Sequence, residues 1–369
     1  MCIGMNTISR PSGAVYARWS LASWITGLTQ EERDQLFFMP MIGHINATDH
    51  PIYTEPWLEK LADRVLTYQE SKLMTPEHLK HIEELELERQ RTGVPDREKH
   101  LGDYTHLLRE CAATNAPYVL MLEDDVLALD GWFHRVRAAI NEIERRTKED
   151  ENGWFYLRLF YTEHSQGWRD EEIPKYIAYA TSVGLCILFA YILGFVYLRS
   201  TVWGKPLIAK YAKTTFFVLA MSFGLFTYLF FSVGKESIWP PRAGVREMPR
   251  GGCCAQGIVY PSSKIEKLTA WYEESRIGFV DTLAERLANE KPHGIEIGSR
   301  WALRPVLLQH IGGQSSKGDN WGTDKPGQMS EAQRLWNFQY ETNDPKQLAR
   351  EHKSAAERFK LLLQLQQDD

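Results

Sequence analysis

Residues 176–198 read YIAYATSVGLCILFAYILGFVYL, and this stretch without a charged side chain decides how the rest of the chain can fold. A second uncharged stretch, TTFFVLAMSFGLFTYLFFSVG, covers residues 214–234. Each has the ~20 residues that a helix needs to cross the ~30 Å hydrocarbon core of a bilayer. Both stretches are apolar on every face, so we expect transmembrane helices and not the buried core helices of a soluble protein.

The segment between the two stretches, residues 199–213, reads RSTVWGKPLIAKYAK and is basic without an acidic residue. Short loops rich in Lys and Arg stay in the cytosol, so we expect a cytosolic loop 199–213. Both outer flanks of such a hairpin lie on the lumenal side and can fold together. We therefore expect a first part of a catalytic domain at 1–172, a transmembrane hairpin at 173–238, a second part of the domain at 239–327 and a helical tail at 328–369.

The sequence begins with CIGMNTI at residues 2–8, which is typical of a strand of a folded domain. Carrying residues 1–175 across a membrane requires a targeting segment. We therefore expect a membrane anchor upstream of Met1.

Composition sets broad limits on the class of protein. A hydrophobic content of 43% and an aromatic content of 12% over 369 residues suffice for a sizeable core. The net charge is only −5, and no basic stripe with interleaved aromatic residues occurs, so nucleic acid is excluded as a partner. A lumenal setting permits disulfides among the cysteines outside the first span, but the sequence leaves their pairing open. These cysteines are Cys2, Cys111, Cys253 and Cys254.

Strand patterns alternate with helical patterns before the hairpin. This order predicts an α/β domain with a largely parallel sheet. The expected strands cover 2–8, 35–44, 118–122, 154–160 and 258–260. The expected helices cover 14–28, 57–68, a segment from Thr75-Pro76 to Gly93, 103–115, 132–146, 264–275 and 279–289.

Three carboxylates, Glu123, Asp124 and Asp125, directly follow the apolar strand YVLML at residues 118–122. Ligands of open α/β sheets bind outside the carboxyl ends of strands. Carboxylates this close repel one another unless a cation lies among them, and Mn²⁺ or Mg²⁺ prefers such oxygen ligands. The alternative is an acidic turn that caps the next helix. The position after a buried strand favours a metal site that a nucleotide diphosphate completes.

His310 lies in LLQHIGGQSS, at an expected strand end before two glycines. An imidazole in this position can complete a metal site made by carboxylates elsewhere in the chain. A single histidine is more often structural, so the sequence pattern alone leaves both interpretations open.

Four motifs in a fixed order carry a family resemblance: KHLGDYTHLLREC at 99–111, YVLMLEDDV at 118–126, CCAQG at 253–257 and LLQHIG at 307–312. Together with the hairpin, they resemble the post-GPI-attachment N-acetylgalactosaminyltransferases. In that family a GT-A glycosyltransferase domain is split by a tandem transmembrane hairpin. The motifs are also similar to those of the N-acetylglucosaminyltransferases that branch N-glycans, which lack an internal hairpin.

The resemblance implies roles for individual residues. Glu123, Asp124, Asp125 and His310 match the metal-binding positions, with Asp124 also expected in the catalytic set. Asp281, in GFVDTLAERL, is the candidate base that contacts the acceptor hydroxyl, with a plain charge at a helix N-terminus as the alternative.

Nucleotide contacts are expected at Arg10, Lys99 and Asp103, with Glu123 near the diphosphate. For the two cations the alternative is a solvated side chain, and for Asp103 it is a helix cap.

By the same resemblance, we expect a Golgi membrane protein with a lumenal catalytic domain. It would move GalNAc from UDP-GalNAc to a mannose of GPI-anchored glycoproteins, with Mn²⁺ or Mg²⁺ and with inversion. One alternative is a related UDP-GlcNAc or UDP-hexose transferase that acts on other glycans. Another is a non-catalytic lumenal binding module with a decayed transferase domain.

Overall fold

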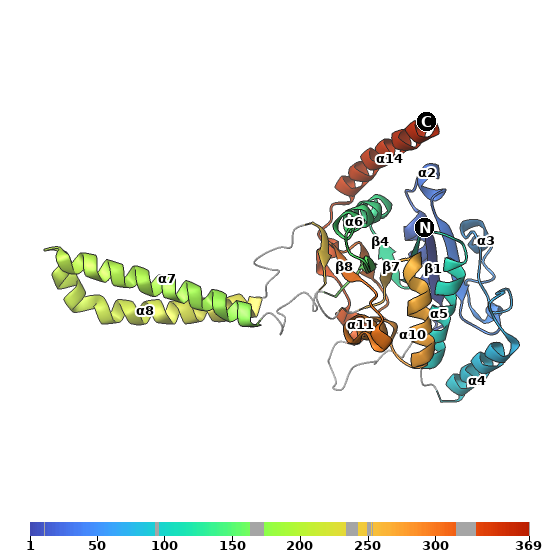
Figure 1. Cartoon of the computed structure of the whole chain (residues 1–369), viewed down its shortest axis with the longest axis horizontal. Helices are drawn as coiled ribbons and strands as arrows, with labels where there is room; N and C mark the ends of the chain where they lie inside the picture. Colours follow the sequence, from blue (N-terminus) through green and yellow to red (C-terminus); the bar gives the residue numbers. More distant parts are fainter. Residues whose placement is uncertain are drawn as a thin grey trace. The chain divides into compact units, whose positions relative to one another are not determined.

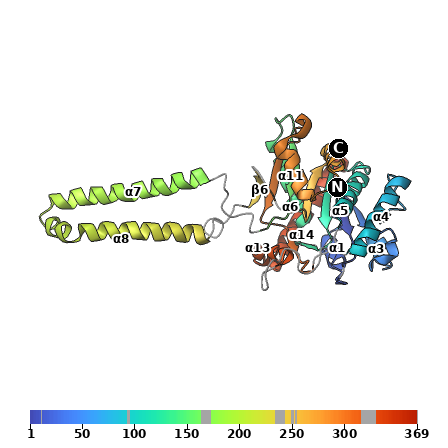
Figure 2. The ribbon, with the colours of Figure 1, turned by 90° about the horizontal axis from the view of Figure 1, so that it is seen from below.

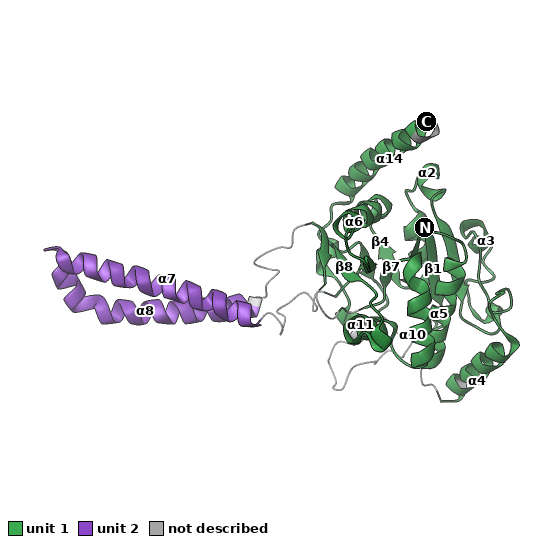
Figure 3. Cartoon of the chain, in the orientation of Figure 1, with its two compact units in different colours: residues 1–165, 242–369 green, residues 166–241 purple. Residues whose placement is uncertain are grey.

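The chain forms two compact units (Figure 3). Residues 1–165 and 242–369 make up the first unit, and residues 166–241 make up the second. The two segments that flank the apolar stretches therefore belong to the same folded body. The computed structural model describes residues 1–10, 12–92, 96–162, 173–233, 243–248, 252, 254–314 and 330–368.

A seven-stranded sheet forms the centre of the first unit in the part of the chain that the structure describes. Its strand order is β2-β1-β3-β7-β5-β8-β6. The strands are β1 (Cys2–Thr7), β2 (Phe37–Ile42), β3 (Tyr118–Glu123), β5 (Trp154–Arg158), β6 (Gly244–Glu247), β7 (Gly257–Pro261) and β8 (Ser299–Arg304). A separate two-stranded sheet pairs β4 (Val126–Ala128) with β9 (Leu308–His310).

The sheet is mixed and not largely parallel as expected. β2, β1 and β3 are mutually parallel, but β7 runs antiparallel to both of its neighbours, β3 and β5. β8 is parallel to β5, and β6 is antiparallel to β8. A crossover helix is needed only between parallel strands, and both antiparallel strands, β6 and β7, follow the hairpin in the sequence. The strands of this sheet that precede the hairpin, β1, β2, β3 and β5, all run in one direction, as their alternation with helices predicts.

Helices cover both faces of this sheet (Figures 1 and 2). The core on one face includes buried side chains of α1, α6 and α14, and the core on the other includes those of α5, α10 and α11. Adjacent strand residues alternate between the two cores, as in Val119 and Leu120 of β3. These helices are α1 (Ala17–Ile25), α5 (Arg97–Ala112), α6 (Trp132–Arg146), α10 (Ser262–Ser275), α11 (Val280–Glu290) and α14 (Pro345–Asp368). Shorter or peripheral helices are α2 (Gln30–Arg33), α3 (Leu58–Leu61), α4 (Pro76–Thr92), α12 (Glu331–Arg334) and α13 (Phe338–Glu341).

The prediction of a helix at 57–68 is wrong beyond the first turn. Only α3 forms, because the following residues run beside β2 and use their backbone groups there. The backbone N–H of Leu66 donates to Pro40 O at 2.8 Å, and the N–H of Ile42 donates to Leu66 O at 2.9 Å. Asp63 also accepts the N–H of Phe38 through its carboxylate at 2.7 Å. Tertiary pairing with a buried strand outweighs the local helical pattern.

The second unit is a hairpin of two long helices, α7 (Ile173–Ser200) and α8 (Gly204–Val233), which lie side by side in both views (Figures 1 and 2). They pack closely where Gly184 faces Phe223, and the hydroxyl of Tyr191 donates to Ala212 O at 3.0 Å. Both helices are long and apolar enough to cross a membrane, and their side chains are exposed within this unit. The protein is therefore membrane-associated.

The turn between the two helices is shorter than the loop expected at 199–213. α8 already begins at Gly204, so Lys205, Lys210 and Lys213 lie on its first turns. A helix of 30 residues is ~45 Å long, which exceeds the ~30 Å hydrocarbon core. The basic turns of α8 therefore fit the headgroup region.

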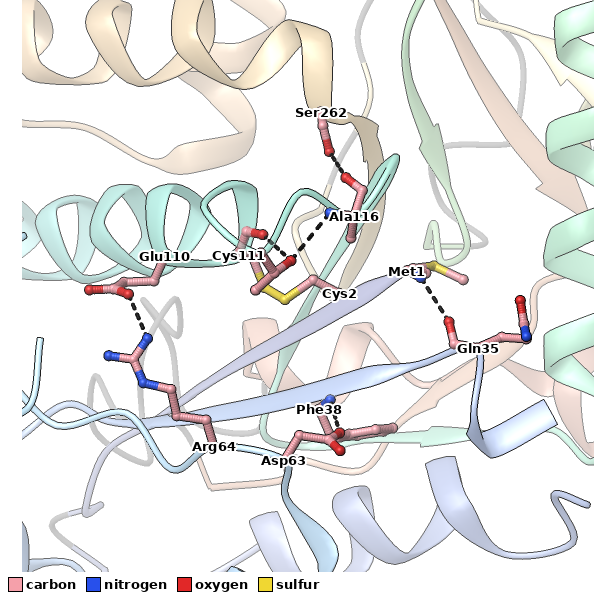
Figure 4. Close-up of a disulfide and its surroundings, with 11 residues drawn as sticks. Met1, Cys2, Gln35, Phe38, Asp63, Arg64, Glu110, Cys111, Ala116 and Ser262 are labelled. Carbon is pink, nitrogen blue, oxygen red and sulfur yellow. Dashed lines mark hydrogen bonds and ion pairs between the residues drawn. A yellow bond between two sulfur atoms is a disulfide. The ribbon is translucent and has the colours of Figure 1, made fainter. Parts of the chain in front are cut away.

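A disulfide between Cys2 and Cys111 joins β1 to the end of α5, with the two Cα atoms 5.6 Å apart (Figure 4). It answers the pairing question that the sequence left open for these two cysteines. The loop that it closes spans 109 residues, for which constraint of the unfolded chain stabilises by ~4–5 kcal/mol in the entropic account. The bond holds β1 against the helix that supplies Lys99 and Asp103.

Candidate active site

The carboxyl ends of three parallel strands form one edge of the sheet. Residues at the ends of β1 and β2 are in register, with Thr7 opposite Ile42, and Asn6 of β1 lies opposite Glu123 of β3. The antiparallel strand β7 begins at the same edge, where Gly257 pairs with Leu122. Ligands of open α/β sheets bind at such an edge. Thr7, Gly43 and the acidic triplet are thus positioned by the ends of neighbouring strands.

The small second sheet brings His310 to the acidic triplet. Val126 of β4 is paired with His310 of β9, and the backbone N–H of Ile311 donates to Asp125 O at 2.8 Å. Nε2 of His310 lies 3.4 Å from Oδ2 of Asp125. Ligand atoms of Glu123, Asp125 and His310 all lie within 4.8 Å of one another, and we call these three residues the strand-edge cluster.

Gly312 lets the backbone after β9 approach the triplet. A Cβ at this position would lie 2.0 Å from Oδ2 of Asp125, which is closer than atoms can approach. Only glycine therefore fits here without displacing the carboxylate. At Gly313, by contrast, an added Cβ meets nothing within 4 Å.

Arg10 is buried between two carboxylates of the triplet. Its guanidinium donates to Oδ1 and Oδ2 of Asp124 at 2.6 and 3.0 Å and to Oδ2 of Asp125 at 3.0 Å. A planar guanidinium suits this forked arrangement, and the charge of Arg10 offsets the repulsion between the aspartates. Thr7 donates its hydroxyl to Oδ2 of Asp124 at 2.5 Å. Both oxygens of Asp124 therefore have protein partners.

The pKa values of Asp124, Asp125 and His310 are shifted in different directions. Burial opposes the charged form of Asp125, but His310 and Arg10 outweigh it, so the pKa of Asp125 is lowered. Burial raises the pKa of Asp124 despite Arg10. For His310, burial favours the neutral ring, yet the charge of Asp125 outweighs it and the pKa of His310 is raised. Arg10 and His310 thus both stabilise the charged form of Asp125.

A divalent cation fits the strand-edge cluster. Oδ1 of Asp125 is buried and has no hydrogen-bond partner among the described residues, which is costly for a carboxylate oxygen in the absence of a ligand. Two carboxylates and one imidazole that converge within coordination reach match the donors that Mn²⁺ accepts. Glu123, Asp125 and His310 are better placed to bind the ion than Asp124, because both oxygens of Asp124 already accept hydrogen bonds.

Lys99 and Asp103, the expected nucleotide contacts on α5, form a buried network of their own. Nζ of Lys99 donates to Gly43 O, to the hydroxyl of Tyr68 and to Oδ2 of Asp103 at 2.7, 2.8 and 3.0 Å. Tyr68 donates to the other oxygen of Asp103. The three donors of the ammonium group are thus used. In this arrangement Lys99 and Asp103 hold the backbone at the end of β2.

Several polar residues at this edge carry no signal in the sequence. His44 accepts the N–H of Ser9 on Nε2 at 2.8 Å, and its Nδ1 lies 3.0 Å from Glu86. His50 contacts Thr7 at 3.0 Å. Glu86 of α4 is buried near the end of β2, where its carboxylate accepts the backbone N–H of Ile45 at 3.0 Å. Such contacts join residues 35–117 positions apart, which local patterns do not predict.

Asp281 lies in the first turn of α11, where its carboxylate accepts the N–H of Thr282 at 2.8 Å. In the described part of the chain it shares no hydrogen bond or ion pair with the acidic triplet or His310. Its electrostatic neighbours include Arg158 at the end of β5, which binds Glu285 at 3.0 Å and Cys254 O. Asp281 thus belongs to the surroundings of β5 and β7, next along the sheet from the strand-edge cluster.

Among the comparisons with known proteins, a family model identifies the class of enzyme. A family model described as GPI-N-acetylgalactosamine transferase PGAP4 matches residues 64–291, more than half of the chain. No curated protein sequence matches. Among solved structures, apo mouse xyloside xylosyltransferase 1 is similar with 9% identity and a TM-score of 0.30, over 79% of this chain and 76% of that one.

Proposed function

This chain belongs to the GPI-N-acetylgalactosamine transferase family PGAP4 and is a glycosyltransferase of GPI glycans, and on this basis we propose that it moves GalNAc from UDP-GalNAc to a mannose of protein-linked GPI anchors. We propose the reaction to be a metal-dependent single displacement with inversion. The observation that supports this proposal most strongly is the convergence of Glu123, Asp125 and His310 at the carboxyl edge of the sheet.

The strand-edge cluster would hold Mn²⁺ or Mg²⁺. When bound, such an ion supplies Lewis-acid stabilisation of the charge that develops on the leaving diphosphate. Arg10 keeps Asp124 and Asp125 in place through three hydrogen bonds, and Asp124 carries no free oxygen of its own. In this proposal Asp124 acts as a positioning residue and Glu123 as a metal and diphosphate ligand.

The nucleotide would lie along the ends of β1 and β2. Lys99 and Asp103 fix Gly43 O at the end of β2, where an added Cβ on Gly43 would already crowd Asp103 at 3.1 Å. These residues would therefore shape the nucleotide site through the backbone. Arg10 would act through the two aspartates that it binds.

Asp281 is our candidate for the base that removes the proton from the acceptor hydroxyl. The acceptor oxygen then forms a bond to the anomeric carbon as the bond from that carbon to the diphosphate breaks. The hairpin would tie the transferase unit to the Golgi membrane in which GPI-linked acceptors are anchored, with the unit on the lumenal side and the basic turn in the cytosol.

The metal site is tested with purified full-length protein, UDP-GalNAc, Mn²⁺ and a mannose-bearing GPI glycan. We expect Asp125→Asn and His310→Gln each to reduce transfer by at least ~100-fold, since each removes a ligand. His293→Gln is the matched control, because His293 is an exposed histidine paired with Glu274. Full transfer by Asp125→Asn would refute the metal role of the cluster, while binding of GPI-linked proteins without turnover by the wild type would indicate a binding module.

The donor is tested with a panel of UDP-sugars under the same conditions. We expect turnover with UDP-GalNAc to exceed that with UDP-GlcNAc and UDP-hexoses, and a reversed preference would replace the donor assignment. Asp281→Asn is expected to lower transfer while UDP binding, followed by calorimetry, stays unchanged. Unchanged transfer by this variant would assign the base elsewhere.

A further inference from the structure

A second group of metal-binding side chains lies away from the acidic triplet and uses none of its residues. Glu32 comes from α2, His134 from α6 and His352 from α14, and one ligand atom of each lies within 4.8 Å of the other two. We call these three residues the tail-helix cluster. Glu32 is 0% exposed, and His352 is also buried.

The ring nitrogens of the two histidines converge on one carboxylate oxygen. Nε2 of His352 lies 3.0 Å from Oε1 and 3.1 Å from Oε2 of Glu32, and Nε2 of His134 contacts Oε1. Oε2 of Glu32 accepts the backbone N–H of Thr29 at 2.7 Å, which fixes the carboxylate in the capping box of α2. Oε1 is thus the oxygen that faces both imidazoles.

Two details distinguish this group from an ordinary hydrogen-bonded cluster. Nε2 of His134 is buried, and it faces Oε1 of Glu32 directly. The other ring nitrogen of His352, Nδ1, lies 2.5 Å from Oδ1 of Asp130. A histidine that binds a metal through Nε2 commonly donates its Nδ1–H to a carboxylate in this way, which orients the ring.

We propose that Glu32, His134 and His352 bind a zinc ion, with Asp130 orienting His352 and a water molecule as the fourth ligand. Two imidazoles and one carboxylate suit Zn²⁺, whereas Mg²⁺ and Ca²⁺ prefer sets of oxygen ligands. In a tetrahedral zinc site, ligand atoms lie about 3.3 Å apart. The 3.0 Å between His352 and Glu32 is close to this separation, so small side-chain shifts are sufficient.

The ion would join the C-terminal helix to elements that precede it by more than 200 residues. α14 already packs on α6, where Phe133 and Phe359 have ring centroids 5.7 Å apart and Arg135 pairs with Glu351 at 2.6 Å. Lys360 pairs with Glu31 of α2 at 2.7 Å. A zinc ion at the centre of these contacts would hold the tail helix on the transferase unit.

The test begins with the metal content of the purified full-length protein after loading with Zn²⁺ and dialysis. We expect one zinc ion per chain, and we expect Asp125→Asn, which disrupts only the strand-edge cluster, to retain it. Glu32→Gln and the double variant His134→Asn, His352→Asn should lose it, whereas His293→Asn should not. Zinc absent from the wild type, or retained by the double variant, would overturn the proposal.

A second measurement uses only the wild type and so does not depend on a variant that folds. A zinc chelator should lower the unfolding temperature by several degrees, and Zn²⁺ but not Mg²⁺ should restore it. Co²⁺ in place of zinc should give the visible absorption of a four-coordinate site. An unfolding temperature unchanged by the chelator, or a six-coordinate Co²⁺ spectrum, would contradict the assignment.

Discussion

The strand-edge cluster and the tail-helix cluster both combine histidine with buried carboxylate, yet they balance charge in different ways. In the strand-edge cluster, Asp125 already has a fixed cation, because Arg10 donates to it at 3.0 Å. One oxygen of Asp125 is nevertheless left without a partner among the described residues. In the tail-helix cluster, Glu32 is met by two imidazoles and a backbone N–H.

This difference predicts two kinds of metal binding. A guanidinium beside the metal site repels an incoming cation, so the strand-edge cluster should bind an ion weakly until a diphosphate adds negative charge. Glu32 has two imidazoles as neighbours, and the tail-helix cluster should hold its ion without a substrate. The first cluster would thus exchange metal during turnover, and the second would keep it.

Replacing the fixed cation should have the largest effect. Arg10→Met keeps much of the volume but leaves Asp124 and Asp125 buried beside each other, so we expect a loss of about 3–5 kcal/mol in the free energy of unfolding. Mn²⁺ should then raise the unfolding temperature of this variant more than that of the wild type. Urea unfolding with and without Mn²⁺ measures both effects.

The control for this variant is Arg18→Met, which breaks an exposed pair with Glu55 and should cost at most about 1 kcal/mol. Equal stability of Arg10→Met and Arg18→Met would show that Arg10 is not the counter-charge of the aspartates.

Gly312 and Gly313 provide a matched pair at the strand-edge cluster. A methyl group at Gly312 must displace the carboxylate of Asp125, whereas one at Gly313 meets nothing within 4 Å. We expect Gly312→Ala to weaken Mn²⁺ binding by about 10–100-fold, as for other changes that misorient a ligand, and Gly313→Ala to leave it unchanged. Calorimetric titration in the presence of UDP gives both affinities, and equal values would argue against Asp125 as a ligand.

His50 contacts Thr7 at the strand edge and is a buried imidazole whose charged form is disfavoured. Burial, together with the nearby His44 and Arg10, lowers the pKa of His50 to about 4. The unfolded chain therefore binds a proton below its pKa of 6.5 while the native state does not. Stability from this group is complete above pH 6.5 and falls as the pH drops toward 4, by up to about 1.4 kcal/mol per pH unit.

The variant His50→Gln should remove this part of the pH dependence. Urea unfolding at pH 5 and pH 7 gives the free energy of unfolding of the wild type and of the variant. If this free energy changes between the two pH values by the same amount in both proteins, groups other than His50 cause the pH dependence.

The smallest effect is expected where the tail helix meets the N-terminus of α6. Gly131 and Gly153 both have left-handed backbones, with φ of +75° and +53°, so alanine costs about 1 kcal/mol at either position. At Gly131 the new Cβ would also approach Cβ of His352 to 3.3 Å, whereas at Gly153 it meets nothing within 4 Å. Gly131→Ala should therefore weaken zinc binding severalfold relative to Gly153→Ala. Equal zinc affinities of the two variants would show that the contact between residue 131 and His352 does not affect the metal site.

The strand-edge cluster was within reach of sequence reasoning because its signals are local. The apolar run YVLML predicts β3, and a strand end fixes where the next three carboxylates must lie. The bounds of α6 likewise follow from a strong apolar periodicity at 132–146. His310 needed the family resemblance, since a single imidazole far along the chain has no local partner.

The tail-helix cluster shows what such reasoning misses. His352 lies in the polar stretch AREHKS, and Glu32 lies in QEER, so neither is distinguished by its neighbours. They meet only because α14 packs back onto the first third of the chain. β8 was missed for a related reason: its arginines are buried, and Arg300 is neutralised by Glu285 from another helix. When buried charges in a strand are paired with residues distant in the sequence, the strand lacks the alternation of apolar and polar residues by which it could be recognised.

The hairpin lies between strands β5 and β6 in the sequence, and this order has a consequence for how the protein is made. β5 pairs only with β7 and β8 among the described strands, and both emerge from the ribosome after the two membrane helices. At ~5–20 residues per second, translation from Arg158 to Gly257 takes about 5–20 s. During that interval β5 has no sheet neighbour and exposes its edges to chaperones. Synthesis of the hairpin must therefore precede completion of the transferase sheet.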